Sequence, residues 1–127
     1  MFAVLVPALS GCGGVDRGAA TEAAGQFYAA VRQRDGDAAC ALLIAATRSE
    51  LEQSAGKPCP AAILEEDIPT PNGPGATVVF GTMAQIRYAG ETAFLTRSDQ
   101  GWRVLAVACG DRPEGPERPY DCQVKGD

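Results

Sequence analysis

Hydrophobic residues change their spacing once along the chain. From Ala19 to about Arg34 they recur at intervals of three and four, which predicts an amphipathic helix. Its apolar stripe comprises Ala20, Ala23, Ala24, Phe27, Tyr28 and Val31. From Ala76 onward the interval becomes two, which is typical of strands. Helices followed by strands predict an α+β fold, with the helices covering one face of a strongly bent, curved antiparallel sheet.

Shorter helices are expected between these two regions. Asp35, Gly36 and Asp37 end the first helix and cap a second, over residues 38–46. The sequence from Thr47 to Glu50 matches a capping box, which predicts further helical turns up to about Ser54. A proline at position 60 suits the first turn of another helix, over residues 61–66.

The second half predicts an antiparallel meander. Residues 76–89 read as one long strand in which Gly81 marks a bulge or a bend. Short turns lead to strands over residues 91–97 and 102–109, and residues 120–124 return beneath the end of the last strand.

Composition restricts the function more than the fold. The 127 residues suffice for one domain; 46% are hydrophobic but only 6% are aromatic, so the core must depend on aliphatic side chains. The net charge of −5 argues against binding to nucleic acid and against electrostatic binding to anionic lipid through basic residues.

Five cysteines fall into two groups. Cys12 stands apart, and the even set of Cys40, Cys59, Cys109 and Cys122 suggests two disulfides in an exported domain. Of three possible connectivities we expect the two local pairs, Cys40–Cys59 and Cys109–Cys122, each worth about 3 kcal/mol. No histidine and no closely spaced cysteine pair is present, so we expect neither a metal nor a cofactor.

The stretch before Cys12 resembles a bacterial lipobox. A short apolar run ends in Leu9, Ser10 and Gly11, although no basic residue precedes Arg17. This resemblance implies a signal peptide over residues 1–11, a lipidated Cys12 with a glycine-rich tether over residues 12–18, and a domain over residues 19–127. It also implies location at the extracytoplasmic face of the cell membrane. The alternatives are an unlipidated secreted chain or a buried apolar strand with an incidental cysteine.

Two later motifs resemble a known superfamily. The sequence Gly-Trp-Arg-Val at residues 101–104 and the sequence Pro-Tyr-Asp-Cys at residues 119–122 are similar to those of small actinobacterial NTF2-like (SnoaL/cystatin-like) lipoproteins. The resemblance implies a long helix packed on a curved sheet to form a cone. Members include enzymes, carriers and interaction modules, so the resemblance does not determine the function.

Four residues are candidates to line such a cone: Tyr28, Gln85, Arg87 and Trp102. The alternative is that Gln85 and Arg87 lie on a solvated sheet face while Tyr28 and Trp102 belong to the core. Since no histidine can act as a general base, we assign no catalytic residue. We expect a non-enzymatic domain that binds a protein or a cell-envelope component. A small-ligand carrier is the first alternative and a SnoaL-type enzyme the second.

Overall fold

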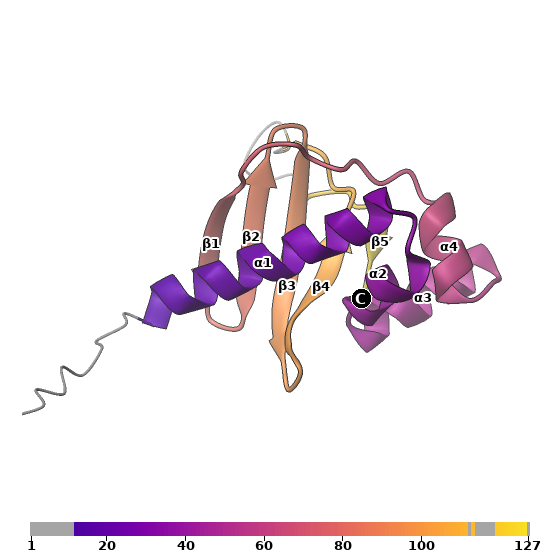
Figure 1. Ribbon diagram of the computed structural model, residues 1–127, viewed down its shortest axis with the longest axis horizontal. Coiled ribbons are helices and arrows are strands. Elements are labelled where there is room, and N and C mark those ends of the chain that lie inside the picture. The colour runs from indigo at the N-terminus through magenta and orange to yellow at the C-terminus, as the bar shows by residue number, and fades with distance from the viewer. Residues whose placement is uncertain (1–11, 112, 114–118, 127) are drawn as a thin grey trace, which may run out of the picture.

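The computed structural model describes residues 12–111, 113 and 119–126, with side chains from Gly14 onward. Four helices and five strands form an α+β architecture (Figure 1). The long helix α1 (Cys12–Arg32) crosses one face of an antiparallel sheet, and the three short helices gather beyond its end, beside the last strands. The predicted fold class is confirmed at this level. The predicted signal peptide and the side chain of Cys12 lie outside the described residues.

Helix α1 carries the predicted apolar stripe. Ala20, Ala24 and Phe27 are fully buried against the sheet. The helix begins at Cys12 rather than near Ala19, so the glycine-rich stretch predicted as a tether is helical. Two contacts with the sheet help to hold this beginning: Asp16 pairs with Arg97, and the hydroxyls of Thr21 and Thr77 lie 2.7 Å apart. Such contacts offset the cost of glycine in a helix, about 1 kcal/mol per residue relative to alanine.

The helix predicted over residues 38–46 forms but ends early, and its last predicted residues belong to the next helix. Helix α2 covers Gly36–Ala41, capped by the Asp35 carboxylate, and helix α3 covers Ala45–Ala55. Between them Leu43 forms a parallel bridge with Val104, and the Val104 N–H donates to the carbonyl of Leu42 at 2.7 Å. This contact between distant residues overrides the local helical pattern.

The predicted capping box at Thr47 is wrong. Thr47 lies inside the first turn of α3 and is fully buried. Its hydroxyl donates to the Leu105 carbonyl of the sheet at 2.7 Å instead of capping the helix. The hydroxyl therefore joins α3 to the sheet.

Helix α4 (Cys59–Glu65) has a proline in its first turn, as predicted. The predicted disulfide between Cys40 and Cys59 is confirmed and joins α2 to the start of α4. The Glu52 carboxylate also accepts a hydrogen bond from the Cys59 N–H at 2.9 Å, so α3 contacts the same helix start. The three short helices thus form one connected unit.

The sheet has strand order β1-β2-β3-β4-β5. The strands are β1 (Ala76–Phe80), β2 (Met83–Tyr88), β3 (Glu91–Ser98), β4 (Gly101–Val107) and β5 (Val124–Lys125). The single long strand predicted over residues 76–89 is wrong: β1 and β2 form a hairpin around Gly81 and Thr82. Gly81 has φ +64°, so a tight reversal forms where a bend was expected.

The two faces of the sheet are covered differently. The face beneath α1 carries fully buried aliphatic side chains, including Ile86, Leu95 and Val104. On the opposite face, the rings of Phe94 and Tyr120 pack edge to face with centroids 5.1 Å apart. The second predicted disulfide, Cys109–Cys122, is confirmed, and both of its half-cystines belong to the small cluster on this face. The C-terminal segment thus covers the β3–β4 end of this face.

Candidate functional site

The structure divides the four predicted pocket residues between the two faces of the sheet. Tyr28 and Trp102 are buried in the core on the α1 side. Gln85 pairs with Phe94 on the opposite face and donates to the Tyr120 hydroxyl at 3.1 Å, while Arg87 is exposed there. Tyr28 and Gln85 therefore do not face one another across a shared pocket.

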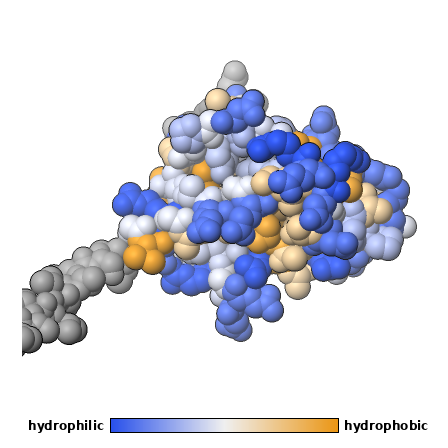
Figure 2. All heavy atoms as spheres, viewed as in Figure 1, coloured by the Kyte–Doolittle hydropathy of each residue, from blue (hydrophilic) through white to orange (hydrophobic). Residues whose placement is uncertain are grey.

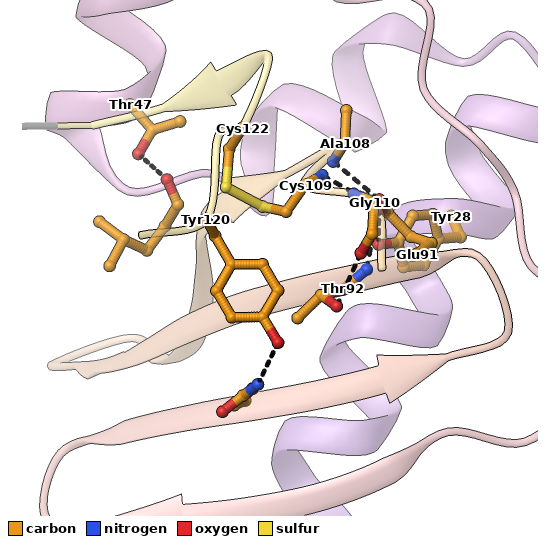
Figure 3. Close-up of a disulfide and its surroundings, with 11 residues drawn as sticks. Tyr28, Thr47, Glu91, Thr92, Ala108, Cys109, Gly110, Tyr120 and Cys122 are labelled. Carbon is orange, nitrogen blue, oxygen red and sulfur yellow. Dashed lines mark hydrogen bonds between the residues drawn. A yellow bond between two sulfur atoms is a disulfide. The ribbon is translucent and has the colours of Figure 1, made fainter. Parts of the chain in front are cut away.

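Glu91, at the start of β3, is the charged residue at the centre of a buried polar cluster. Its side chain is 1% exposed. One carboxylate oxygen accepts hydrogen bonds from the Tyr28 hydroxyl at 2.9 Å and the Ala108 N–H at 2.7 Å (Figure 3). The other accepts from the N–H groups of Cys109 at 3.0 Å and Gly110 at 3.1 Å. It also accepts from the N–H of the residue that follows Glu91, at 3.0 Å.

Three successive N–H groups reach Glu91 because the chain after β4 turns sharply. Ala108 has φ +59° and Gly110 has φ +70°, so two residues of the turn adopt left-handed conformations. A non-glycine residue in this region costs about 1–3 kcal/mol. Hydrogen bonds to the carboxylate offset this cost, since successive N–H groups in such a turn form an anion-binding concavity. Glu91 supplies the anion from within the chain.

The carboxylate also acts on two tyrosines. Burial raises the pKa of Tyr28 well above its usual 10.0, and the charge and hydrogen bond of Glu91 raise it further. Burial, followed by the charge of Glu91, raises the pKa of Tyr88 as well. The rings of Tyr28 and Tyr88 pack edge to face, with their centroids 5.5 Å apart. Tyr28 therefore remains a neutral hydrogen-bond donor.

This arrangement is that of a structural anchor rather than a general base. Five donors occupy the two carboxylate oxygens, so Glu91 has little capacity left to accept a substrate proton. A depression of about 330 Å³ lies beside the turn, but Glu91 does not line it. The lining residues are Asp67, Pro69, Ala108, Cys109, Gly110, Asp121 and Gln123. Residues 12–111, 113 and 119–126 include no group of three acidic or cysteine side chains suited to hold a metal.

A different kind of site lies along β1, the strand at the edge of the sheet. Its outer edge pairs with no described strand. Of the described large hydrophobic side chains, three are exposed: Val15 at 61%, Val78 at 55% and Phe80 at 49%. Hydrophobic atoms are visible where α1 begins, on a surface that is otherwise mostly polar (Figure 2).

No family model, curated protein or solved structure matches the chain.

The hydrophobic pattern did not indicate Glu91 as a site residue. A single glutamate after Gly90 looks like an ordinary exposed turn residue in the sequence. Four of its five donors lie 17 to 19 residues later or in a helix 63 residues earlier, so no local spacing brings them together. The edge strand has a visible signal, namely five uncharged residues, but the alternation of the sequence predicts it only as the first part of a longer strand.

Proposed function

We propose that this chain is a non-enzymatic, lipid-anchored domain on the extracytoplasmic side of the membrane, and that it binds a protein partner. The observation that carries the binding function is the exposed apolar surface of β1, where Val78 and Phe80 remain about half exposed. Because Val78 and Phe80 are two residues apart on one strand, their side chains lie on the same face and form a small exposed apolar surface.

The two disulfides support an exported domain. Such bonds persist in oxidising compartments and are rare in the cytosol. Cys12 is left over from these pairs and directly follows the lipobox-like sequence, which supports its role as the attachment point. No described helix is long and apolar enough to cross a bilayer.

The order of the elements supports an NTF2-like arrangement. A long helix precedes short helices and an antiparallel meander, as the resemblance of residues 101–104 and 119–122 implies. The occupied carboxylate of Glu91 favours binding over catalysis within this arrangement, since the buried acid is committed to hydrogen bonds within the chain. We therefore propose a function for the surface of the sheet rather than for a cone.

Membrane attachment is tested by replacing Cys12 with serine. We expect C12S to leave the membrane fraction while the parent chain stays in it, because lipid modification requires the thiol. A Ser10→Thr variant that retains the thiol is a control for expression. Persistent membrane association of C12S would refute anchoring at this residue.

Partner binding is tested with a photo-crosslinking side chain introduced in living cells. We expect a discrete adduct from position 80, on the exposed strand, and none from position 50, which is exposed on α3. Equal labelling from both positions, or labelling from neither, would contradict binding at β1.

A further inference from the structure

We propose that the partner contributes an extended apolar segment containing a carboxylate, and that this segment pairs as a sixth strand with the outer edge of β1, which no described strand occupies. This inference rests on the proposed binding function and specifies its chemistry. Three features of β1 support it: its unpaired backbone groups, its uncharged side chains and the cation beside it.

The backbone of β1 offers hydrogen bonds on its outer side. The two-residue turn makes Phe80 and Met83 a hydrogen-bonded pair, and such pairs alternate along an antiparallel ladder. The N–H and C=O groups of Thr77 and Val79 therefore point away from β2. Among the described residues, neither makes a backbone hydrogen bond outside the sheet ladder. These groups are available to an added strand.

The side chains of β1 lack the usual protection of a free edge. Natural edge strands avoid pairing through charged residues, proline or bulges. Strand β1 reads Ala-Thr-Val-Val-Phe and pairs with β2 without a bulge. A segment added to the edge extends the apolar surface of Val78 and Phe80.

Arg17 provides the charge that selects the segment. It lies beside the edge and lines a depression of about 240 Å³ together with Thr77, Val78 and Val79. No ion pair joins Arg17 to a carboxylate among the described residues, and the adjacent Asp16 pairs with Arg97 instead. A residue of the added strand opposite Thr77 or Val79 points to the same face as α1. A carboxylate at that position faces Arg17.

The same cation disfavours a second copy of this chain as the occupant. Two copies paired through β1 would be related by a two-fold axis. An axis centred anywhere on residues 77–79 brings the two Arg17 side chains together, because Arg17 lines the groove beside all three residues. Their repulsion favours a partner of opposite charge.

The test uses the full chain, isotopically labelled and purified in detergent with its disulfides intact. The probe is an acetylated and amidated peptide, Val-Thr-Val-Glu-Val-Thr-Val, which has the same order of residues in both directions. Its valines share one face, and its glutamate lies on the other. Peptides with glutamine or lysine in place of glutamate are matched probes.

We expect the glutamate peptide to shift the amide resonances of Thr77 and Val79 most. The glutamine peptide is expected to bind about three- to fivefold more weakly, the upper part of the range for an exposed ion pair. Arg17→Gln should remove this difference, while Arg87→Gln is the matched control and should preserve it. Val79→Pro should abolish the shift of the Thr77 amide, because it removes an outward N–H that the added strand would use.

Absence of edge shifts at millimolar peptide would overturn the proposal. Equal binding of the glutamate and lysine peptides would overturn the role of Arg17, and this readout does not depend on whether Val79→Pro folds. Edge shifts that follow protein concentration without peptide would identify a second copy as the occupant and contradict the proposed partner. A crosslink from position 80 without peptide binding would retain the proposed function while overturning this mode of binding.

Discussion

The two ends of the sheet differ in how many of their polar groups are hydrogen-bonded within the chain and in how much of their apolar surface is buried. Around β3 and β4, a buried carboxylate receives five hydrogen bonds, and a disulfide holds the C-terminal segment over the outer face. At β1, two residues direct their backbone groups outward and two large apolar side chains are exposed. The buried hydrogen bonds and a disulfide are thus concentrated at one end, and the surface proposed to bind a partner lies at the other.

This separation allows the edge to remain open without loosening the domain. A backbone N–H or C=O group that bonds only to water costs the fold little, whereas a buried polar group without a hydrogen-bond partner costs about 1–3 kcal/mol. Substitutions at the two ends should therefore differ sharply in their effect on the free energy of unfolding.

The largest loss is expected from Glu91→Ala. It leaves the Tyr28 hydroxyl and the N–H groups of the turn without their acceptor, at a cost of about 3–5 kcal/mol in the free energy of unfolding. Chemical denaturation measures this quantity, with the exposed Glu50→Ala as control. If Glu91→Ala does not fold, the unfolding free energy of Glu91→Gln is compared with that of Glu50→Ala instead. A loss equal to that of the control would refute the anchoring role.

Removal of the Cys109–Cys122 disulfide should have the next largest effect. Replacing both cysteines with alanine is expected to cost about 2–4 kcal/mol in the free energy of unfolding. The disulfide joins residues 13 apart, and without it the unfolded chain gains conformational freedom. The replacement should also speed the exchange of backbone amide hydrogens in β3, because the segment that carries Tyr120 no longer packs firmly on Phe94. A large loss of stability without faster amide exchange in β3 would mean that the disulfide does not hold the C-terminal segment over Phe94.

Tyr28→Phe should have a moderate effect that depends on pH. Loss of one buried hydrogen bond is expected to cost about 1–1.5 kcal/mol near neutral pH. Because the folded pKa is raised above 10.0, the unfolded chain loses the proton first, and the stability of the parent chain falls as pH rises above that value.

The phenylalanine variant lacks this contribution, so its unfolding free energy should decline less steeply above pH 10. Tyr88, whose pKa is also raised, retains part of the slope. Parallel curves for the parent and the variant would contradict the coupling between Tyr28 and Glu91.

The smallest effect is expected at the open end. Val78→Thr replaces an exposed side chain on β1 and should change the unfolding free energy by less than about 0.5 kcal/mol. Ile86→Val, on the buried face of β2, is a matched control with an expected cost of about 0.5–1.5 kcal/mol. Similar losses from both would contradict the difference between the two ends.

Features that depend on local spacing were predictable from the sequence. The stripe of α1, the proline in the first turn of α4 and both disulfides follow from periodicity, backbone restriction and short separations along the chain. Features that depend on distant partners were not. Thr47 matches a capping residue by its neighbours, but the Leu105 carbonyl, 58 residues later, determines its role.

The candidate sites show the same division. The composition of β1 was visible, but its edge position follows from the reversal at Gly81, which the alternation of residues did not distinguish from a bend. The importance of Glu91 requires the left-handed turn at Ala108, an alanine that carries no sequence preference for that conformation. Both sites therefore became recognisable only with the topology.

Continuous helix from Cys12 onward has a mechanical consequence for an anchored domain. At 1.5 Å per residue, the eight steps from Cys12 to the buried Ala20 span about 12 Å. The ion pair of Asp16 with Arg97 ties this segment to the sheet. If Cys12 carries a lipid, the helix is a short, rigid connection to the membrane that limits how far the domain can tilt or move away from the bilayer. The edge of β1 would then be presented close to the bilayer, within reach of segments that emerge from the membrane and distant from partners deep in the surrounding envelope.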